Sequence, residues 1–406
     1  MSRARRRLRA LALIAPLTLP LAHCGGAPPS PTASRSVTAA ASFNDRFPGP
    51  QDDFADRFQA AEMISPQPVE AAPPKRIVTT AERFPARSGV QMASLAPQLP
   101  FHQQRERDEL TTLVGLQSSA FPYLGKNPRT DEPFLNVSDG PRRGHRGPGG
   151  RVYWQDQTYA DNRVLMHVPR QFDIDRPGVI VVFFHGNGAT LERDVRDRQL
   201  LPQQISNSGA NAVLLAPQLA VDAVDSSAGK FWQPGGLKRF LAESAQHLAQ
   251  LTGDPSSAKK FAAMPVVIVA YSGGYVPAAW SLAVGGAGER IRGVVLLDAV
   301  YGELDKFAGW IERNRSAFFV SSYTRYTRRH DEELMRLLRD KGVSYAEDFD
   351  RPLKPGSVIF VETEDGITHR DYVTQAWTKN PVQTVLAKLA GSPSLTRLAA
   401  NEGAGR

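Results

Sequence analysis

The amino-acid sequence predicts an α/β fold in which a mostly parallel central sheet has helices on both faces. From residue 179 onward, short continuous apolar runs recur along the chain, and such runs are typical of strands buried on both faces of a sheet. Segments with apolar residues at three- and four-residue steps, which are typical of helices, separate these runs. This alternation of strand and helix indicates an α/β architecture.

Two alternating runs, at residues 152–159 and 164–168, predict an antiparallel start to the sheet. The predicted buried strands that follow are residues 179–184, 212–216, 266–270, 294–297, 317–320 and 358–361. The predicted helices are residues 193–206, 237–251, 275–284, 304–313, 331–339 and 382–389. We expect these elements to form one domain over residues 111–392, followed by a flexible tail at 393–406.

Residues 1–24 have the three parts of a secretory signal, namely an arginine-rich start, an apolar run and an end with small residues. The apolar run at residues 10–22 is too short for a membrane span, which needs about 20 residues. We therefore expect export from the cytoplasm. The net charge of +8 falls to +3 without the five arginines of this signal. A charge of +3 gives no strong field for a polyanion, so we expect no nucleic-acid partner.

The only cysteine of the chain, Cys24, directly follows the apolar run and rules out an internal disulfide. Residues 21–24 resemble a bacterial lipobox, in which the cysteine is acylated. His23 departs from that motif, because the position normally holds Gly, Ala or Ser. The resemblance implies a lipid anchor at Cys24 on the periplasmic face of the cell envelope. The alternative is ordinary signal cleavage, which would leave a soluble periplasmic or secreted protein.

Residues 25–110 are rich in Ala, Pro, Ser and Gln and show no sustained apolar period. Such a composition cannot bury enough apolar surface to offset chain entropy, so we expect a disordered linker. An acid-Arg-Phe triplet occurs three times in it, at residues 45–47, 56–58 and 82–84. The repeat is either a docking motif for an envelope partner or compositional drift.

The strongest chemical motif follows the predicted strand at 266–270, where Tyr271-Ser272-Gly273-Gly274 leads into a helix. It resembles the Gly-x-Ser-x-Gly nucleophile elbow of the α/β-hydrolase superfamily. Ala270 replaces the first glycine, and a strained turn of this kind needs small residues on both sides of the serine. The resemblance implies that Ser272 is a nucleophile. The structural alternative is a serine that caps the following helix.

A glycine-rich loop, His185-Gly186-Asn187-Gly188, follows the predicted strand at 179–184. It resembles the His-Gly-x-Gly loop of esterases and lipases in the same superfamily. The resemblance implies an oxyanion hole built from Gly186, Asn187, Gly188 and Gly273, while His185 itself is expected to be structural. A simple glycine turn or a phosphate loop is the alternative, but the nucleotide-binding spacings are missing.

The same resemblance implies a histidine base after the last strand and an acid between nucleophile and base. His369 follows the predicted strand at 358–361, and Asp298 ends the predicted strand at 294–297. Most members of the superfamily place the acid one strand later, where the first carboxylate is Asp331. We expect Asp298 to be the acid, with Asp331 as the alternative.

The loop after the predicted strand at 212–216 is expected to overhang the site, because ligands bind beyond the carboxyl ends of such strands. We predict that substrate contacts come from this loop and from the residue before the nucleophile, namely Ser226, Ser227, Lys230, Trp232 and Tyr271. Ser227 and Lys230 also match the Ser-x-x-Lys motif of penicillin-binding proteins, which is a competing enzymatic interpretation.

Together these features predict a serine hydrolase that cleaves an ester or amide through an acyl-enzyme in the cell envelope. The substrate would be a small-molecule or cell-envelope acyl compound. No metal or organic cofactor is expected, because no His and Cys residues have ligand spacing. A non-catalytic envelope binding protein on the same fold is the alternative from a different class.

Overall fold

The computed structural model describes residues 109–147, 149–350 and 352–390. The predicted signal with Cys24, the acid-Arg-Phe triplets and the predicted tail lie outside the described residues. None of the helices in this described part is both long enough and apolar enough to span a membrane.

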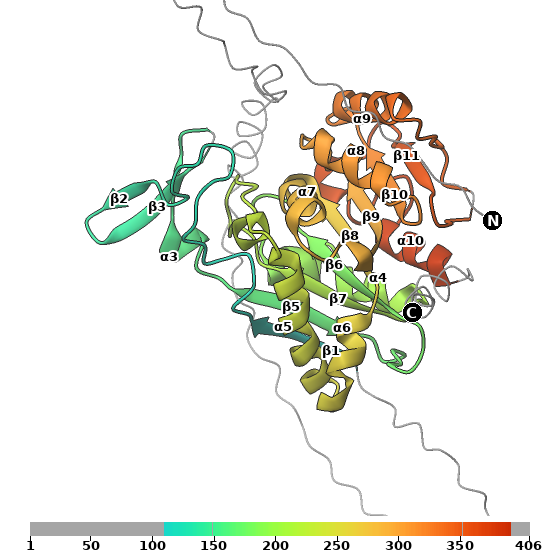
Figure 1. Ribbon diagram of the computed structural model, residues 1–406, viewed down its shortest axis with the longest axis horizontal. Coiled ribbons are helices and arrows are strands. Elements are labelled where there is room, and N and C mark those ends of the chain that lie inside the picture. The colour runs from blue at the N-terminus through green and yellow to red at the C-terminus, as the bar shows by residue number, and fades with distance from the viewer. Residues whose placement is uncertain (1–108, 148, 351, 391–406) are drawn as a thin grey trace, which may run out of the picture. The chain divides into compact units, whose positions relative to one another are not determined.

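The described chain is built on an eight-stranded sheet with the order β1-β5-β7-β6-β8-β9-β10-β11 (Figure 1). Strand β5 runs antiparallel to both of its neighbours, β1 and β7, and every pair from β7 to β11 is parallel. This arrangement confirms the predicted fold class. The strands are β1 Leu110–Gly115, β5 Arg163–Val168, β6 Val179–Phe184, β7 Ala212–Pro217, β8 Val266–Tyr271, β9 Ile291–Leu297, β10 Phe318–Tyr323 and β11 Val358–Glu362.

Helices cover both faces of the sheet, which explains why its strands are apolar without alternation. One face packs against residues of α5, α6, α7, α8 and α9, and the other against α4, α10 and a π-helical segment. Alternate residues of β6 enter the two cores, with Val182 in the first and Val181 in the second. The helices are α4 Leu201–Asn207, α5 Gly236–Leu251, α6 Ala258–Ala263, α7 Tyr275–Val284, α8 Leu304–Arg313, α9 Arg328–Asp340 and α10 Pro381–Ala390.

The first predicted helix, 193–206, is two pieces in the structure. A π-helical segment covers Leu191–Arg198, and α4 begins at Leu201. Leu200 separates them in the left-handed conformation, with a φ of 54°. Pro202 then lies in the first turn of α4, where the missing N–H of a proline has no intrahelical acceptor to lose.

The predicted strand at 152–159 is also different in the structure. Its first half is β4 (Val152–Trp154), which pairs with β3 (Arg142–Arg146) in a separate sheet that also contains β2 (Val137–Asp139). Its second half is α3 (Gln155–Thr158). The apolar alternation that suggested one strand comes from Tyr153 and Tyr159, which are both buried.

The segment from residue 116 to 160 packs against the loop after β7 and fixes its position. Its aromatic side chains form a cluster in which Phe134 lies 5.0 Å from Tyr159 and 5.8 Å from Trp232, measured between ring centroids. The Tyr159 hydroxyl donates to Asp225 at 2.7 Å, and the backbone N–H of Lys230 donates to Ala120 at 2.9 Å. The shape of the loop therefore depends on a distant part of the sequence.

Candidate active site

The turn after β8 has the geometry of a nucleophile elbow. Ser272 has a φ of +52°, which a residue other than glycine rarely adopts and which costs free energy. A Cβ on Gly274 would lie 2.2 Å from the carbonyl oxygen of Phe184, so the elbow fits against the end of β6 only with glycine there. Ala270 is small enough to be fully buried in the same place.

Three side chains form a continuous hydrogen-bonded line at the carboxyl edge of the sheet. The Ser272 hydroxyl Oγ lies 2.8 Å from His369 Nε2, and His369 Nδ1 lies 2.6 Å from Asp298 Oδ2. These residues follow β8, β11 and β9, so the parallel strands bring their ends to one edge. Because the hydroxyl points to the imidazole, the helix-capping alternative for Ser272 does not describe the structure.

Asp298 is completely buried and has several hydrogen-bond donors. It accepts bonds from the backbone N–H of Thr324 at 3.0 Å and from the Thr327 hydroxyl at 2.9 Å. Burial on its own would raise the pKa of Asp298, but its interactions with His369, Thr324 and Thr327 outweigh burial and hold the pKa below the usual range. The carboxylate is therefore ionised at neutral pH and can orient the His369 ring.

Tyrosine rings surround the His369 side chain. Tyr271 stacks on it with centroids 5.1 Å apart, and its hydroxyl donates to the His369 carbonyl oxygen at 2.6 Å. Tyr301 and Tyr326 present their rings edge-on, at 6.1 and 6.4 Å. The prediction that Tyr271 contacts substrate is not what the structure shows, because this side chain is buried and holds the histidine loop instead.

Asp331, the alternative acid, lies in the first turn of α9 and points elsewhere. It accepts a hydrogen bond from the Ser321 hydroxyl at 2.5 Å, and no bond joins it to His369. Complete burial raises the pKa of Asp331 well above the usual range for an aspartate. Burial thus favours the protonated form of Asp331, whereas hydrogen-bond donors favour the ionised form of Asp298.

The loop after β6 supplies fewer oxyanion donors than the sequence predicted. The backbone N–H of Gly188 donates to the Ala223 carbonyl oxygen at 2.8 Å, so it is occupied. Gly186 packs against the nucleophile, since a Cβ there would lie 2.9 Å from Ser272 Cβ. Among the described residues, no backbone acceptor outside the helices and strands takes the N–H of Gly186, Asn187 or Gly273. These three N–H groups are the remaining candidate donors.

His185 is structural, as expected. Its side chain is buried, and its Nε2 accepts a hydrogen bond from the Leu219 backbone N–H at 2.9 Å. Burial lowers the pKa of His185 to about 4, so the ring is neutral at physiological pH. The neutral ring ties the β6 loop to the β7 loop and fixes the position of Asn187.

Of the four residues predicted in the β7 loop, the structure places only Ser226 beside the nucleophile turn. Its hydroxyl donates to Asn187 Oδ1 at 3.1 Å, and both side chains lie against the Cα of Gly273. Trp232 is buried in the aromatic cluster with Phe134 and Tyr123 and does not face the site.

Ser227 and Lys230 bond to other groups and not to each other, so they do not form a Ser-x-x-Lys pair, and their substrate contacts stay predictions. The Ser227 hydroxyl donates to Asp225 at 2.8 Å, and the Lys230 ammonium donates to the Gln117 carbonyl oxygen at 2.7 Å. The reason is the packing of the loop on residues 116–160, which the loop sequence does not reveal. A Ser-x-x-Lys site would need the hydroxyl and the amine to bond each other.

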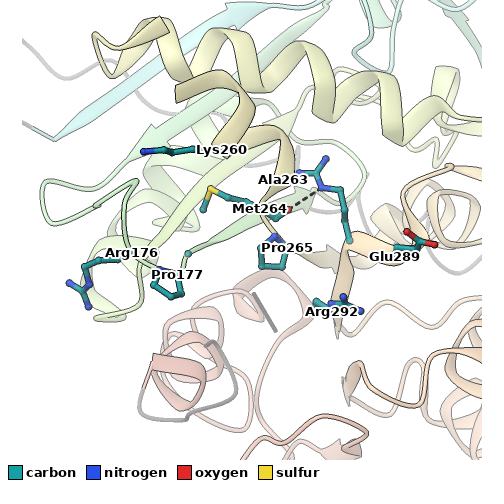
Figure 2. A pocket seen from close by; sticks show the side chains of 10 residues that line it. Arg176, Pro177, Lys260, Ala263, Met264, Pro265, Glu289 and Arg292 are labelled. Carbon is teal, nitrogen blue, oxygen red and sulfur yellow. Dashed lines mark hydrogen bonds between the residues drawn. The ribbon is translucent and has the colours of Figure 1, made fainter. Parts of the chain in front are cut away.

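A pocket of about 170 Å³ lies at the opposite edge of the sheet, where β6, β8 and β9 begin (Figure 2). A six-residue strand is about 20 Å long, so this pocket is remote from Ser272. The pocket is lined by Arg176, Pro177, Gly178, Lys260, Ala263, Met264, Pro265, Glu289, Arg290 and Arg292.

No group of three His, Cys, Asp or Glu residues within the described ranges could hold a metal ion.

Sequence reasoning missed the tyrosines that surround the site. Tyr301 comes three residues after Asp298, and Tyr326 lies in the loop after β10. Their positions just beyond strand ends were a usable signal, because ligands bind there. Arg129 interacts with Tyr275 near the site. Its position in the sequence did not predict this, because it lies in the loop before β2 and not after a strand of the large sheet.

No known family model matches the chain, and no curated protein matches it. Among solved structures, it is similar to a feruloyl esterase module from Clostridium thermocellum complexed with sinapinate, at 14% identity and a TM-score of 0.36, covering 67% of this chain and 94% of that one. A ferulic acid esterase has 11% identity, a TM-score of 0.38 and coverages of 71% and 98%. Thermogutta terrifontis esterase 2 has 12% identity and a TM-score of 0.33, and the match covers 56% of this chain and 87% of that one. Such distant similarities add nothing to what strand order and site geometry show.

The contrast between the two aspartates predicts a pH effect on stability. Asp331 has a folded-state pKa above its unfolded value of about 3.9, so its contribution to stability is lost as pH rises from about 4 toward the folded value. We expect Asp331→Asn to gain stability over wild type by up to about 1.4 kcal/mol per pH unit in that window. Urea unfolding at pH 4.5, 6 and 7.5 measures the difference, with Asp340→Asn on the same helix as the control. A difference that does not change with pH would contradict the assignment.

Proposed function

We propose that this protein is a serine hydrolase that cleaves an ester or amide bond through an acyl-enzyme. The observation that carries the proposal is the hydrogen-bonded line from Ser272 through His369 to Asp298, built on a strained turn. A serine with a positive φ at the end of a parallel strand costs free energy, and such strain is typical of functional positions. The same geometry recurs in hydrolases of unrelated folds, so it indicates a catalytic mechanism and not common descent.

In the first half of the reaction His369 Nε2 removes the proton from the Ser272 hydroxyl as the oxygen attacks the substrate carbonyl carbon. The 2.8 Å distance already places the two atoms for this transfer. The protonated His369 then gives the proton to the leaving alcohol or amine, and the carbonyl–leaving-group bond breaks. Water attacks the acyl-enzyme with the same histidine as base and releases the acid.

Asp298 has two tasks in this scheme. Its bond to His369 Nδ1 fixes the tautomer with a basic Nε2, and its negative charge stabilises the imidazolium that forms. The donors Thr324 and Thr327 keep the carboxylate ionised although it is buried. The backbone N–H groups of Asn187 and Gly273 would hold the oxyanion.

A fluorophosphonate probe tests the proposal directly. The Ser272 oxygen would bond to phosphorus and displace fluoride, so we expect stoichiometric labelling of the wild type and none of Ser272→Ala. Ser227→Ala is the control, because that hydroxyl bonds to Asp225 and should leave labelling unchanged. Peptide mapping by mass spectrometry identifies the labelled residue. An unlabelled wild type would favour a non-catalytic binding protein.

We further propose that the enzyme works in the cell envelope, anchored by a lipid on Cys24. The support is the sequence of residues 1–24 alone.

Metabolic labelling with an alkynyl palmitate in a bacterial host tests the anchor on the full chain. The wild type should become labelled and sediment with membranes, whereas Cys24→Ser should stay unlabelled. An unlabelled wild type recovered in the soluble periplasmic fraction would point instead to ordinary signal cleavage.

A further inference from the structure

A charged cluster lies beside the proposed active site, on the loop that connects Asp298 to α8. Its centre is Glu303, whose side chain is only 1% exposed and whose φ is 58°. Arg129 and Lys306 both form ion pairs with this carboxylate, and the Trp280 indole N–H donates to it at 3.2 Å. A buried carboxylate with this many donors is held in one position.

Glu303 has enough partners on the domain itself without Arg129. Lys306 Nζ lies 2.5 Å from Glu303 Oε2 and 4.8 Å from the centre of the Trp280 ring. Lys306 also lies 3.4 Å from Asp305, but that carboxylate is 78% exposed and therefore screened by water. Arg129 comes from the loop before β2. The Glu303 carboxylate is already paired with Lys306, so the ion pair with Arg129 is a second one.

Arg129 is connected to the site through tyrosine rings. Its guanidinium lies close enough to Tyr275 for the two groups to interact electrostatically, and Tyr275 is three residues after Ser272 in the first turn of α7. The Tyr275 ring is 6.1 Å from that of Tyr301, and the Tyr301 ring is 6.1 Å from that of His369. The guanidinium thus lies one step beyond these two ring contacts, on the far side of Tyr275 from His369.

The Arg129 side chain keeps 44% of its surface exposed although it has two partners. A guanidinium has five N–H donors in a planar fork, and in Arg129 the Nη2 group donates to Glu303. Arginine held by a buried acid is preorganised to bind a second oxyanion, particularly a carboxylate, with paired hydrogen bonds.

We propose that Arg129 is a substrate-binding residue and that the preferred substrates are esters or amides that carry a carboxylate away from the scissile bond. This inference rests on the proposed hydrolase function and adds a substrate class to it. The competing explanation is that Arg129 only fastens the loop before β2 to the domain.

Matched pairs of 4-nitrophenyl esters separate the two explanations. The acidic series is the half-esters of linear dicarboxylic acids with four to ten carbons, and the neutral series is the monocarboxylic esters of equal chain length. A second pair, 3-carboxyphenyl acetate and phenyl acetate, places the charge on the leaving group. For the wild type we expect at least one acidic ester to have a higher kcat/KM than its neutral partner.

The deciding quantity is the ratio of kcat/KM for the acidic ester to that for its neutral partner within one variant. In Arg129→Met this ratio should fall by roughly tenfold or more, mainly through KM, because a charge-assisted hydrogen bond is lost. Arg129→Lys should recover part of it. Arg142→Met is the control and should keep the wild-type ratio, because it removes an arginine of β3 whose ion pair is with Asp156 of α3.

Two results would overturn the inference. One is a wild type that prefers no acidic ester in either series, and the other is an Arg129→Met variant that loses both substrates in proportion. The second result, together with a lowered Tm, would assign Arg129 to loop fastening. Failure of the hydrolase proposal would be visible separately, because the wild type would then hydrolyse neither series and resist the fluorophosphonate probe.

Discussion

The bond between the Asp298 carboxylate and the imidazole of His369 is the interaction on which the site depends. Asp298 is removed from water completely, and a charge buried in this way is costly unless donors replace the lost hydration. Thr324 and Thr327 come from the chain that leaves β10, so this neighbouring strand supplies the donors that keep the acid ionised. Without them burial would raise the pKa and the histidine would lose its partner.

The parallel sheet turns this local chemistry into a defined geometry. Neighbouring strands β8 and β9 end at the same edge, so Ser272 and Asp298 emerge side by side, and the chain after β11 returns His369 between them. Glycines at the elbow allow the β6 end to approach Ser272 closely. Tyr271 adds a stacking contact and a hydrogen bond that keep the returning loop in place.

The parts that could be predicted from the sequence are those fixed by strand ends. Ser272, Asp298 and His369 each follow an apolar run, so the rule that such ends share an edge made them candidates. The resemblance to the α/β-hydrolase superfamily grouped them and left Asp331 as an alternative acid. Lys230 and Trp232 could not be placed, because the packing of residues 116–160 decides where their loop points. Gly188 was misplaced for a similar reason, since Ala223 in that loop accepts its N–H.

The central claim is that Asp298, and not Asp331, works with His369. The most direct measurement is kcat on an activated ester for Asp298→Asn and Asp331→Asn side by side, with folding checked by circular dichroism. Losing the charge beside His369 should lower kcat by roughly 10³-fold or more in Asp298→Asn. Asp331→Asn should stay within about threefold of wild type, because the Asp331 carboxylate bonds to Ser321 and not to His369. Equal losses, or a larger loss in Asp331→Asn, would contradict the account.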